Sequence, residues 1–265
     1  MATTDPDPPI PEPTGGEHRL AYARDLEELS TGVLRLGAMA CEAIPRGTEV
    51  LLGGNLADAQ TLIDDDDSID QLTLELEERC YSIIALQAPM AGELRRIITI
   101  TKVVAEIERS ADLMVNVCKA TRRMYGAQLS PKIRGVLASM SSEASKLLRL
   151  SIDAFADENV SLASALGDID DELDQLNRDI VEAIFEAHAA DQIDLGAAVQ
   201  LALIARYYER IGDHAVNIGE RVGYMVTGWL PEHNGRLRAE NRQRQAGGDP
   251  ADEGSGGDPT SSEDD

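Results

Sequence analysis

The chain has 265 residues, of which 43% are apolar and only 3% aromatic, and it carries a net charge of −24. A core poor in aromatic side chains and rich in Leu, Ile, Val and Ala favours helices over sheets. Residues 1–18 carry −4 and residues 244–265 carry −6, so residues 19–243 still carry −14, which argues against nucleic acid or anionic lipid as a partner.

Both ends of the chain differ in composition from its body. Residues 1–18 are acidic and proline-rich and contain no apolar segment typical of a signal peptide, and residues 232–265 are acidic and rich in Gly and Ser. We expect both segments to be disordered tails. Three widely spaced cysteines indicate reduced, buried thiols, and no apolar run is long enough to span a membrane. These features predict a cytoplasmic protein without membrane insertion.

Six helical stretches follow between the tails. Pro45 is expected to bend the first, Asn55 to cap the second, Ser130 and Pro131 to begin the fourth, and Asn159 to cap the fifth. The expected ranges are about 20–52, 55 to just before Pro89, 92–125, from 130 onward, 159–189 and 193–228.

Apolar spacing and an internal repeat indicate how these helices pack. In the last stretch Leu201, Ile204, Tyr208 and Ile211 step by three and four residues, as in helical bundles. The two halves match at an offset of 101 residues in the third and sixth stretches and of 104 residues in the second and fifth. The sequence therefore predicts an all-α tandem pair of three-helix bundles, in residues 19–127 and 128–231. A single long six-helix bundle is the alternative.

The repeat contains the motif Glu-Arg-x-x-Asp-x-x-x-Asn in both halves. Its carboxylates lie four residues apart, on one helix face, and its Asn adds an amide oxygen one turn further on. Oxygen donors of this kind suit Mg, Ca, Mn or ferric iron, with Zn as a further option. The predicted ligands are Glu108, Asp112 and Asn116 in the first half and Glu209, Asp213 and Asn217 in the second.

Two carboxylates from one helix are too few to enclose a metal ion, so a second helix must contribute. The acidic starts of the second and fifth stretches are the candidates, with Asp67 and Asp70 matching Asp171 and Asp174. If Tyr208 is a core position, Glu209 and Asp213 point outward from the bundle. The site is then exposed, and it faces solvent, a neighbouring helix or another protein.

Other interpretations of these residues stay open. Acids on an outward helix face are often simply solvated, and Arg109 and Arg210 could tether them. His214 matches Leu113 in the first half, so we expect it at the surface or at an interface rather than as a ligand. A di-iron enzyme would use Glu-x-x-His in the bundle core, and that pattern does not occur in the sequence. We therefore predict no catalytic residues, and a metal-free helical scaffold remains a third hypothesis.

Several segments resemble the PhoU family of phosphate-transport accessory proteins. Residues 201–228 are similar to its second signature helix, residues 87–97 and 106–117 resemble the first, and residues 69–72 and 173–176 resemble its acidic helix starts. The resemblance implies two three-helix bundles, a homodimer and multinuclear metal sites of iron, manganese, zinc or magnesium. It also implies a non-catalytic role. Such a protein restrains the high-affinity phosphate ABC transporter through its ATPase subunit and signals phosphate sufficiency to a sensor histidine kinase.

Overall fold

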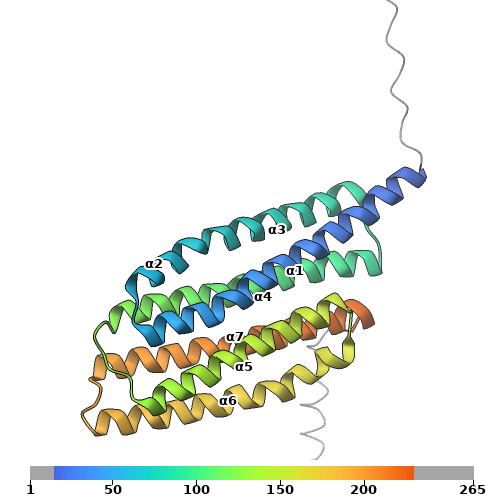
Figure 1. Ribbon diagram of the computed structural model, residues 1–265. Helices are drawn as coiled ribbons and strands as arrows, with labels where there is room; N and C mark the ends of the chain where they lie inside the picture. The colour runs from blue at the N-terminus through green and yellow to red at the C-terminus, as the bar shows by residue number, and fades with distance from the viewer. Residues whose placement is uncertain (1–14, 230–265) are drawn as a thin grey trace, which may run out of the picture. The chain divides into compact units, whose positions relative to one another are not determined.

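The computed structural model describes residues 15–229, and this part of the chain contains seven helices and no strand. Figure 1 shows the helices as long, roughly parallel rods. They are α1 (Gly15–Gly53), α2 (Leu56–Asp65), α3 (Asp67–Gln87), α4 (Gly92–Arg123), α5 (Pro131–Ala156), α6 (Val160–Ala189) and α7 (Leu195–Thr227). Most of the two predicted tails lies outside the described residues. Within residues 15–229 no helix is long and apolar enough to cross a membrane.

Local capping chemistry sets most helix ends where the sequence predicts them. The side chains of Asn55, Ser130 and Asn159 accept hydrogen bonds from backbone N–H groups in the first turns of α2, α5 and α6. Asp194 caps α7 in the same way, and Gly228 ends it in the left-handed conformation at φ 78°. The boundaries predicted at Asn55, Ser130, Asn159 and Gly228 are confirmed.

The second predicted stretch is not one helix, because it divides into α2 and α3 at Asp66. Asp66 lies within four consecutive aspartates, whose like charges weaken a continuous helix. Packing also favours the break, since Ala59 and Leu62 of α2 cover Val50 and Cys118 in a small apolar cluster separate from the main core. α1, in contrast, continues through Pro45 as a single helix.

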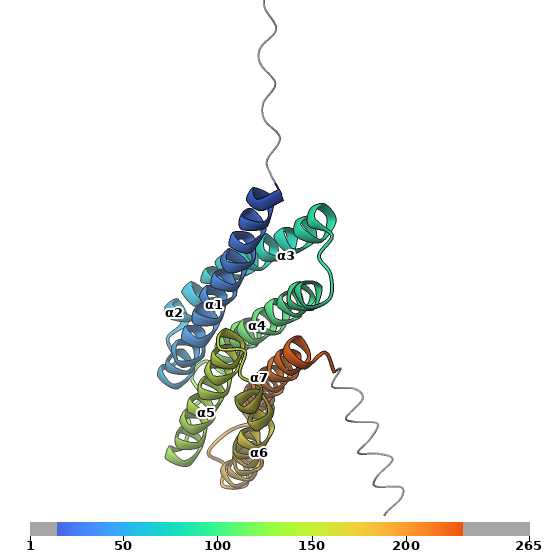
Figure 2. The ribbon, with the colours of Figure 1, turned by 90° about the vertical axis from the view of Figure 1, so that its right-hand side faces the viewer.

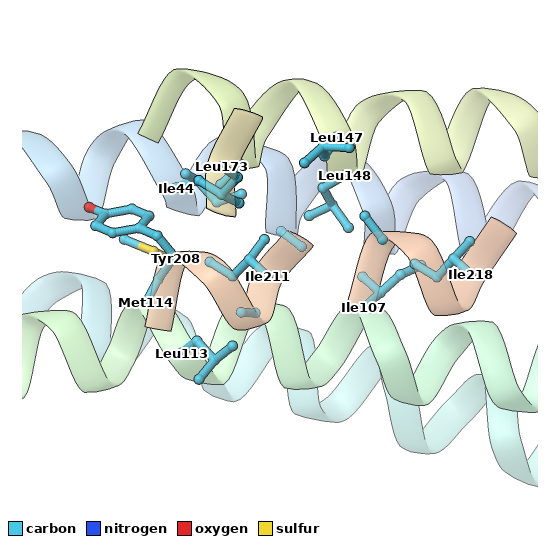
Figure 3. Packing of buried hydrophobic residues seen from close by; sticks show 14 of the residues in the cluster. Ile44, Ile107, Leu113, Met114, Leu147, Leu148, Leu173, Tyr208, Ile211 and Ile218 are labelled. Atoms are coloured by element: carbon cyan, nitrogen blue, oxygen red, sulfur yellow. The ribbon is translucent and has the colours of Figure 1, made fainter. Parts of the chain in front are cut away.

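The predicted tandem pair of three-helix bundles is confirmed, with α1, α2–α3 and α4 in the first bundle and α5, α6 and α7 in the second (Figures 1 and 2). The bundles are joined along α4 and α7 and along α1 and α5. One apolar cluster includes residues of both bundles. In Figure 3, Tyr208 and Ile211 of α7 lie among side chains of α1, α4 and α6, so the two halves share their core.

One polar group lies inside this shared core. The Tyr208 hydroxyl and the Thr48 hydroxyl are 2.6 Å apart, and Thr48 also donates to Ser141 Oγ at 2.7 Å or to Ile44 O at 2.8 Å. Burial raises the pKa of Tyr208 above its usual range, so it stays a neutral phenol. This network joins α1, α5 and α7, and it satisfies polar atoms that would otherwise destabilise the core.

Candidate metal centre

In the second half, carboxylates of α6 and α7 come together along the line where the two helices pack. Asp170 and Asp174 lie one turn apart on α6, and Glu209 and Asp213 lie one turn apart on α7. Burial raises the pKa of Asp170 to about 6, and the nearby charges of Asp174, Asp213 and Glu209 contribute to the increase. We call these four residues the second acidic group.

Asp170 is the innermost member of this group. Its Oδ1 atom is buried and has no hydrogen-bond partner among the described residues. It lies directly against the α7 backbone at Gly212, where an added Cβ would overlap it. A buried carboxylate oxygen without a donor is costly, and a cation would remove that cost.

The outer members of the second acidic group have polar partners. Arg206 forms an ion pair with Glu209 and lies 3.8 Å from an oxygen of Asp213. Asn177 of α6 donates to the second oxygen of Glu209 at 3.3 Å. Arg206 is half-exposed, so it can swing into solvent when another cation takes its place.

The first half contains an equivalent group at the start of α3 and on α4, with Asp66 as the residue that precedes α3. Burial raises the pKa of Asp66 to about 6, with contributions from Asp70, Asp112 and Glu108. Burial and the charge of Asp112 also raise the pKa values of Glu108 and Asp70. These residues form the first acidic group, and each member occupies the position of its counterpart in the second acidic group. The positive charge of Lys119 partly offsets the effect at Asp66.

The structure brings together most, but not all, of the predicted ligands. Glu108, Asp112, Glu209, Asp213, Asp70 and Asp174 belong to the two acidic groups, whereas Asp67 and Asp171 are exposed neighbours that influence Asp70 and Asp170 by charge. Asn217 turns instead to Glu106 Oε2, to which it donates at 3.4 Å. Asn116 is half-buried on α4.

Sequence reasoning missed Asp66 and Asp170. Each precedes Asp70 or Asp174 by four residues, which is the same spacing that identifies the motif on α4 and α7. That repeated spacing could have identified them, but the four consecutive aspartates made Asp67 as plausible as Asp66. Burial distinguishes them, because Asp66 is half-buried and Asp67 is exposed.

The two acidic groups fit a hard cation in chemistry. They offer carboxylate oxygens, and neighbouring negative charges add to the effect of burial in raising the pKa values of Asp66, Asp70, Glu108 and Asp170. A bound cation would relieve this repulsion. Among residues 15–229, no three His, Cys, Asp or Glu side chains stand close enough to form a ready metal site. Binding would therefore require carboxylates of the two helices to move toward the ion.

Of the two expected places for His214, the surface and an interface, the structure excludes the surface and places the residue between the two halves of the chain. It is buried, with 6% of its surface exposed, and its Nδ1 lies 2.6 Å from Glu106 Oε2 on α4. Although burial raises the pKa of Glu106, its contacts with His214 and Asn217 hold that pKa below its usual range. His214 on α7 and Glu106 on α4 thereby link the two halves of the chain, which pack against each other along these two helices.

Comparison with known proteins places this architecture. The family model described as the PhoU domain matches residues 33–121 and 137–222, once in each half. The chain belongs to the PhoU family. It is 33% identical to the phosphate-specific transport system accessory protein PhoU homolog 1 of Mycobacterium tuberculosis over 80% of this chain and 96% of that protein. It is 32% identical to homolog 2 of the same organism, over 80% and 100%.

Solved structures of PhoU proteins show the same fold. The crystal structure of PhoU from Pseudomonas aeruginosa matches with a TM-score of 0.73 at 27% identity, over 78% of this chain and all of that chain. PhoU from Streptococcus pneumoniae, described as a phosphate transport system regulatory protein, matches with a TM-score of 0.72 over 79% and 98%. The resemblance of the signature helices to the PhoU family is thereby confirmed.

Proposed function

We propose that this chain is a non-catalytic accessory protein of phosphate transport. In this role it restrains the high-affinity phosphate ABC transporter through the ATPase subunit and reports phosphate sufficiency to a sensor histidine kinase. The support is membership of the PhoU family, whose relatives are named as accessory or regulatory proteins of phosphate transport. A homodimer in the cytoplasm is part of the same proposal.

We further propose that metal ions bind at the first and second acidic groups. The observation that carries this is the duplication of four carboxylates at the same register in both halves, together with the buried, partnerless Oδ1 of Asp170. A bound ion would neutralise the repulsion between α6 and α7 and between α3 and α4. The protein would supply oxygen donors and hold them on two rigid helices, and iron, manganese, zinc and magnesium all accept such donors.

The regulatory role is tested by deleting the gene and measuring phosphate uptake and the phosphate-starvation response. Deletion should raise uptake in phosphate-rich medium and activate the starvation response, and the intact gene should restore both to normal. Unchanged uptake together with an unchanged starvation response would contradict the role.

The metal sites are tested by metal analysis of the purified protein. Glu209→Ala/Asp213→Ala should bind less metal than the unaltered protein. Glu182→Ala/Glu186→Ala is the matched control, because it also removes two carboxylates one turn apart but leaves both acidic groups intact. Equal metal content in all three proteins would favour the metal-free scaffold.

A further inference from the structure

Between the second acidic group and the turn that joins α6 to α7, the exposed residues along the boundary of the two helices are apolar. Val181 and Phe185 lie on α6 and Leu195 and Val199 on α7, and they are exposed to 38%, 71%, 65% and 49%. We call these four residues the α6–α7 apolar seam. Single exposed apolar residues are ordinary, whereas several in one place mark a binding surface.

Helix geometry shows that the seam is continuous. Val181 follows Asp174 and Asn177 on one ridge of α6, and Phe185 lies one turn beyond. The bond between Asn177 and Glu209 and the contact of Asp170 with Gly212 set the antiparallel register of the two helices. In that register Phe185 is level with Val199. The seam therefore begins where the second acidic group ends and runs to the turn between α6 and α7.

The first half provides an internal comparison. Tyr81 and Ile98 are exposed at the positions equivalent to Phe185 and Val199. The position equivalent to Val181, however, is Glu77, which places a charge in the middle of the seam. Only the second half has a fully apolar seam, although both halves have the same fold.

Charges around the seam indicate what covers it. Glu182 and Glu186 border it on α6, and Asp191 and Asp194 lie in the turn at its far end. The nearby cations are Arg178, Lys132 and Arg206; Lys132 is paired with Glu186 and Arg206 with Glu209. The four border carboxylates outnumber Lys132 and Arg178, so the border stays acidic even if metal ions neutralise the second acidic group. A second copy of this chain would bring the same acidic border and a net charge of −24, so it is a poor occupant.

We propose that the α6–α7 apolar seam is the docking site for an amphipathic helix of a partner protein, with an apolar stripe bordered by Lys and Arg. Such a helix would lie along the boundary between α6 and α7. Its apolar stripe would contact Phe185 and Val199, and its basic residues would face the acidic border. The proposal rests on the proposed function in one respect, because a regulator without enzymatic activity acts by contacting other proteins.

The experiment uses the full chain and three synthetic helical peptides of about 18 residues, a length that spans the seam. The first has a Leu stripe bordered by Lys, the second has Glu in place of Lys, and the third has Ser in place of Leu. Fluorescence anisotropy measures binding to the unaltered protein and to two matched variants. Phe185→Ser/Val199→Ser alters the seam, and Tyr81→Ser/Ile98→Ser alters the equivalent positions of the first half. All four residues are exposed, so both variants should keep their helical circular dichroism spectrum and melting temperature.

The Lys-bordered peptide should bind the unaltered protein and the first-half variant equally, and Phe185→Ser/Val199→Ser should weaken it by about tenfold or more. The Glu and Ser peptides should bind at least about tenfold more weakly than the Lys peptide.

Equal binding of the Lys-bordered peptide to both variants, or equal binding of the Glu peptide and the Lys peptide, would overturn the proposal. So would sedimentation that shows a dimer converted to a monomer by Phe185→Ser/Val199→Ser, because a second copy would then cover the seam. If the seam binds the peptide but deletion of the gene leaves phosphate uptake unchanged, the docking proposal holds and the proposed regulatory role does not.

Discussion

Glu106 on α4 and His214 on α7 are joined by a 2.6 Å contact in the buried surface between the two halves of the chain. The pair has no equivalent elsewhere in the repeat, since Tyr207 stands at the position of Glu106 in the second half and Leu113 at that of His214 in the first. It thus breaks the internal symmetry at the place where the two bundles meet. Arg109 also contacts the other oxygen of Glu106 at 3.3 Å.

Replacing His214 by the Leu of the first half should destabilise the protein. The change leaves the Glu106 carboxylate largely buried without its main partner, which costs on the order of 3 kcal/mol in the free energy of unfolding. Urea denaturation at neutral pH would measure the loss. Adding Glu106→Gln to His214→Leu should recover part of it, because the uncompensated charge is then gone. A single variant as stable as the unaltered protein would show that the pair contributes little.

Much of the fold was predictable because its signals are local. Asn55, Ser130 and Asn159 cap helices within three residues of themselves, and the apolar spacing of α7 needs only one helix to be visible. The break at Asp66 was not predictable, since it depends on α2 covering Val50 and Cys118 from distant parts of the chain.

The candidate site was half predictable for the same reason. The repeat of the motif on α4 and α7 can be seen in the sequence. The carboxylates that face it from the neighbouring helix depend on the register between the two helices, which the sequence does not show. Thus the four-residue spacing makes Asp170 a candidate, but only its position against Gly212 shows that it lies in the site. The role of His214 depends on its contact with a residue 108 positions away.

Gly212→Ala should disturb the second acidic group specifically. The new methyl group would overlap Asp170 Oδ1, so α6 or that carboxylate must shift. We expect metal binding to weaken by about tenfold and the protein to lose about 1–3 kcal/mol of stability. Gly223→Ala is the control on the same helix, because nothing lies within 4 Å of its added Cβ. It should stabilise the protein by about 0.5–1 kcal/mol and leave metal binding unchanged. Identical effects of the two variants would contradict this account of Gly212.

The raised pKa of Asp170 predicts the pH dependence of the metal-free protein. The carboxyl has an ordinary pKa of 3.8 and a folded-state pKa of about 6, so between these values the folded state holds a proton that the unfolded state has lost. Stability should therefore fall as pH rises through this window.

Asp170→Asn tests this origin of the pH dependence. It should raise stability at pH 7 by about 1 kcal/mol, a value reduced for the partial solvent access of the group, and should change little near pH 4. Thermal melts across pH in the presence of a chelator measure both effects. A gain at pH 4 as large as that at pH 7 would show that charge repulsion is not its cause.

The two acidic groups should differ in metal affinity. Lys119 lies near Asp66 and offsets its charge, whereas the equivalent residue of α7 is Glu220. An ammonium group beside a carboxylate competes with a metal ion for the same negative charge. Ala111 also occupies the position in α4 that Gly212 occupies in α7. In the second half, the missing side chain of Gly212 leaves the space in which Asp170 approaches the helix backbone, and the first half lacks that space. We therefore expect the second acidic group to bind metal more tightly than the first.

Titration with Mn²⁺ should show a larger loss of tight binding in Glu209→Ala/Asp213→Ala than in Glu108→Ala/Asp112→Ala. Lys119→Glu should strengthen the weaker site, and Glu220→Lys should weaken the stronger one. Equal losses in the two double variants, with no response to either charge reversal, would show that these differences in sequence do not distinguish the sites.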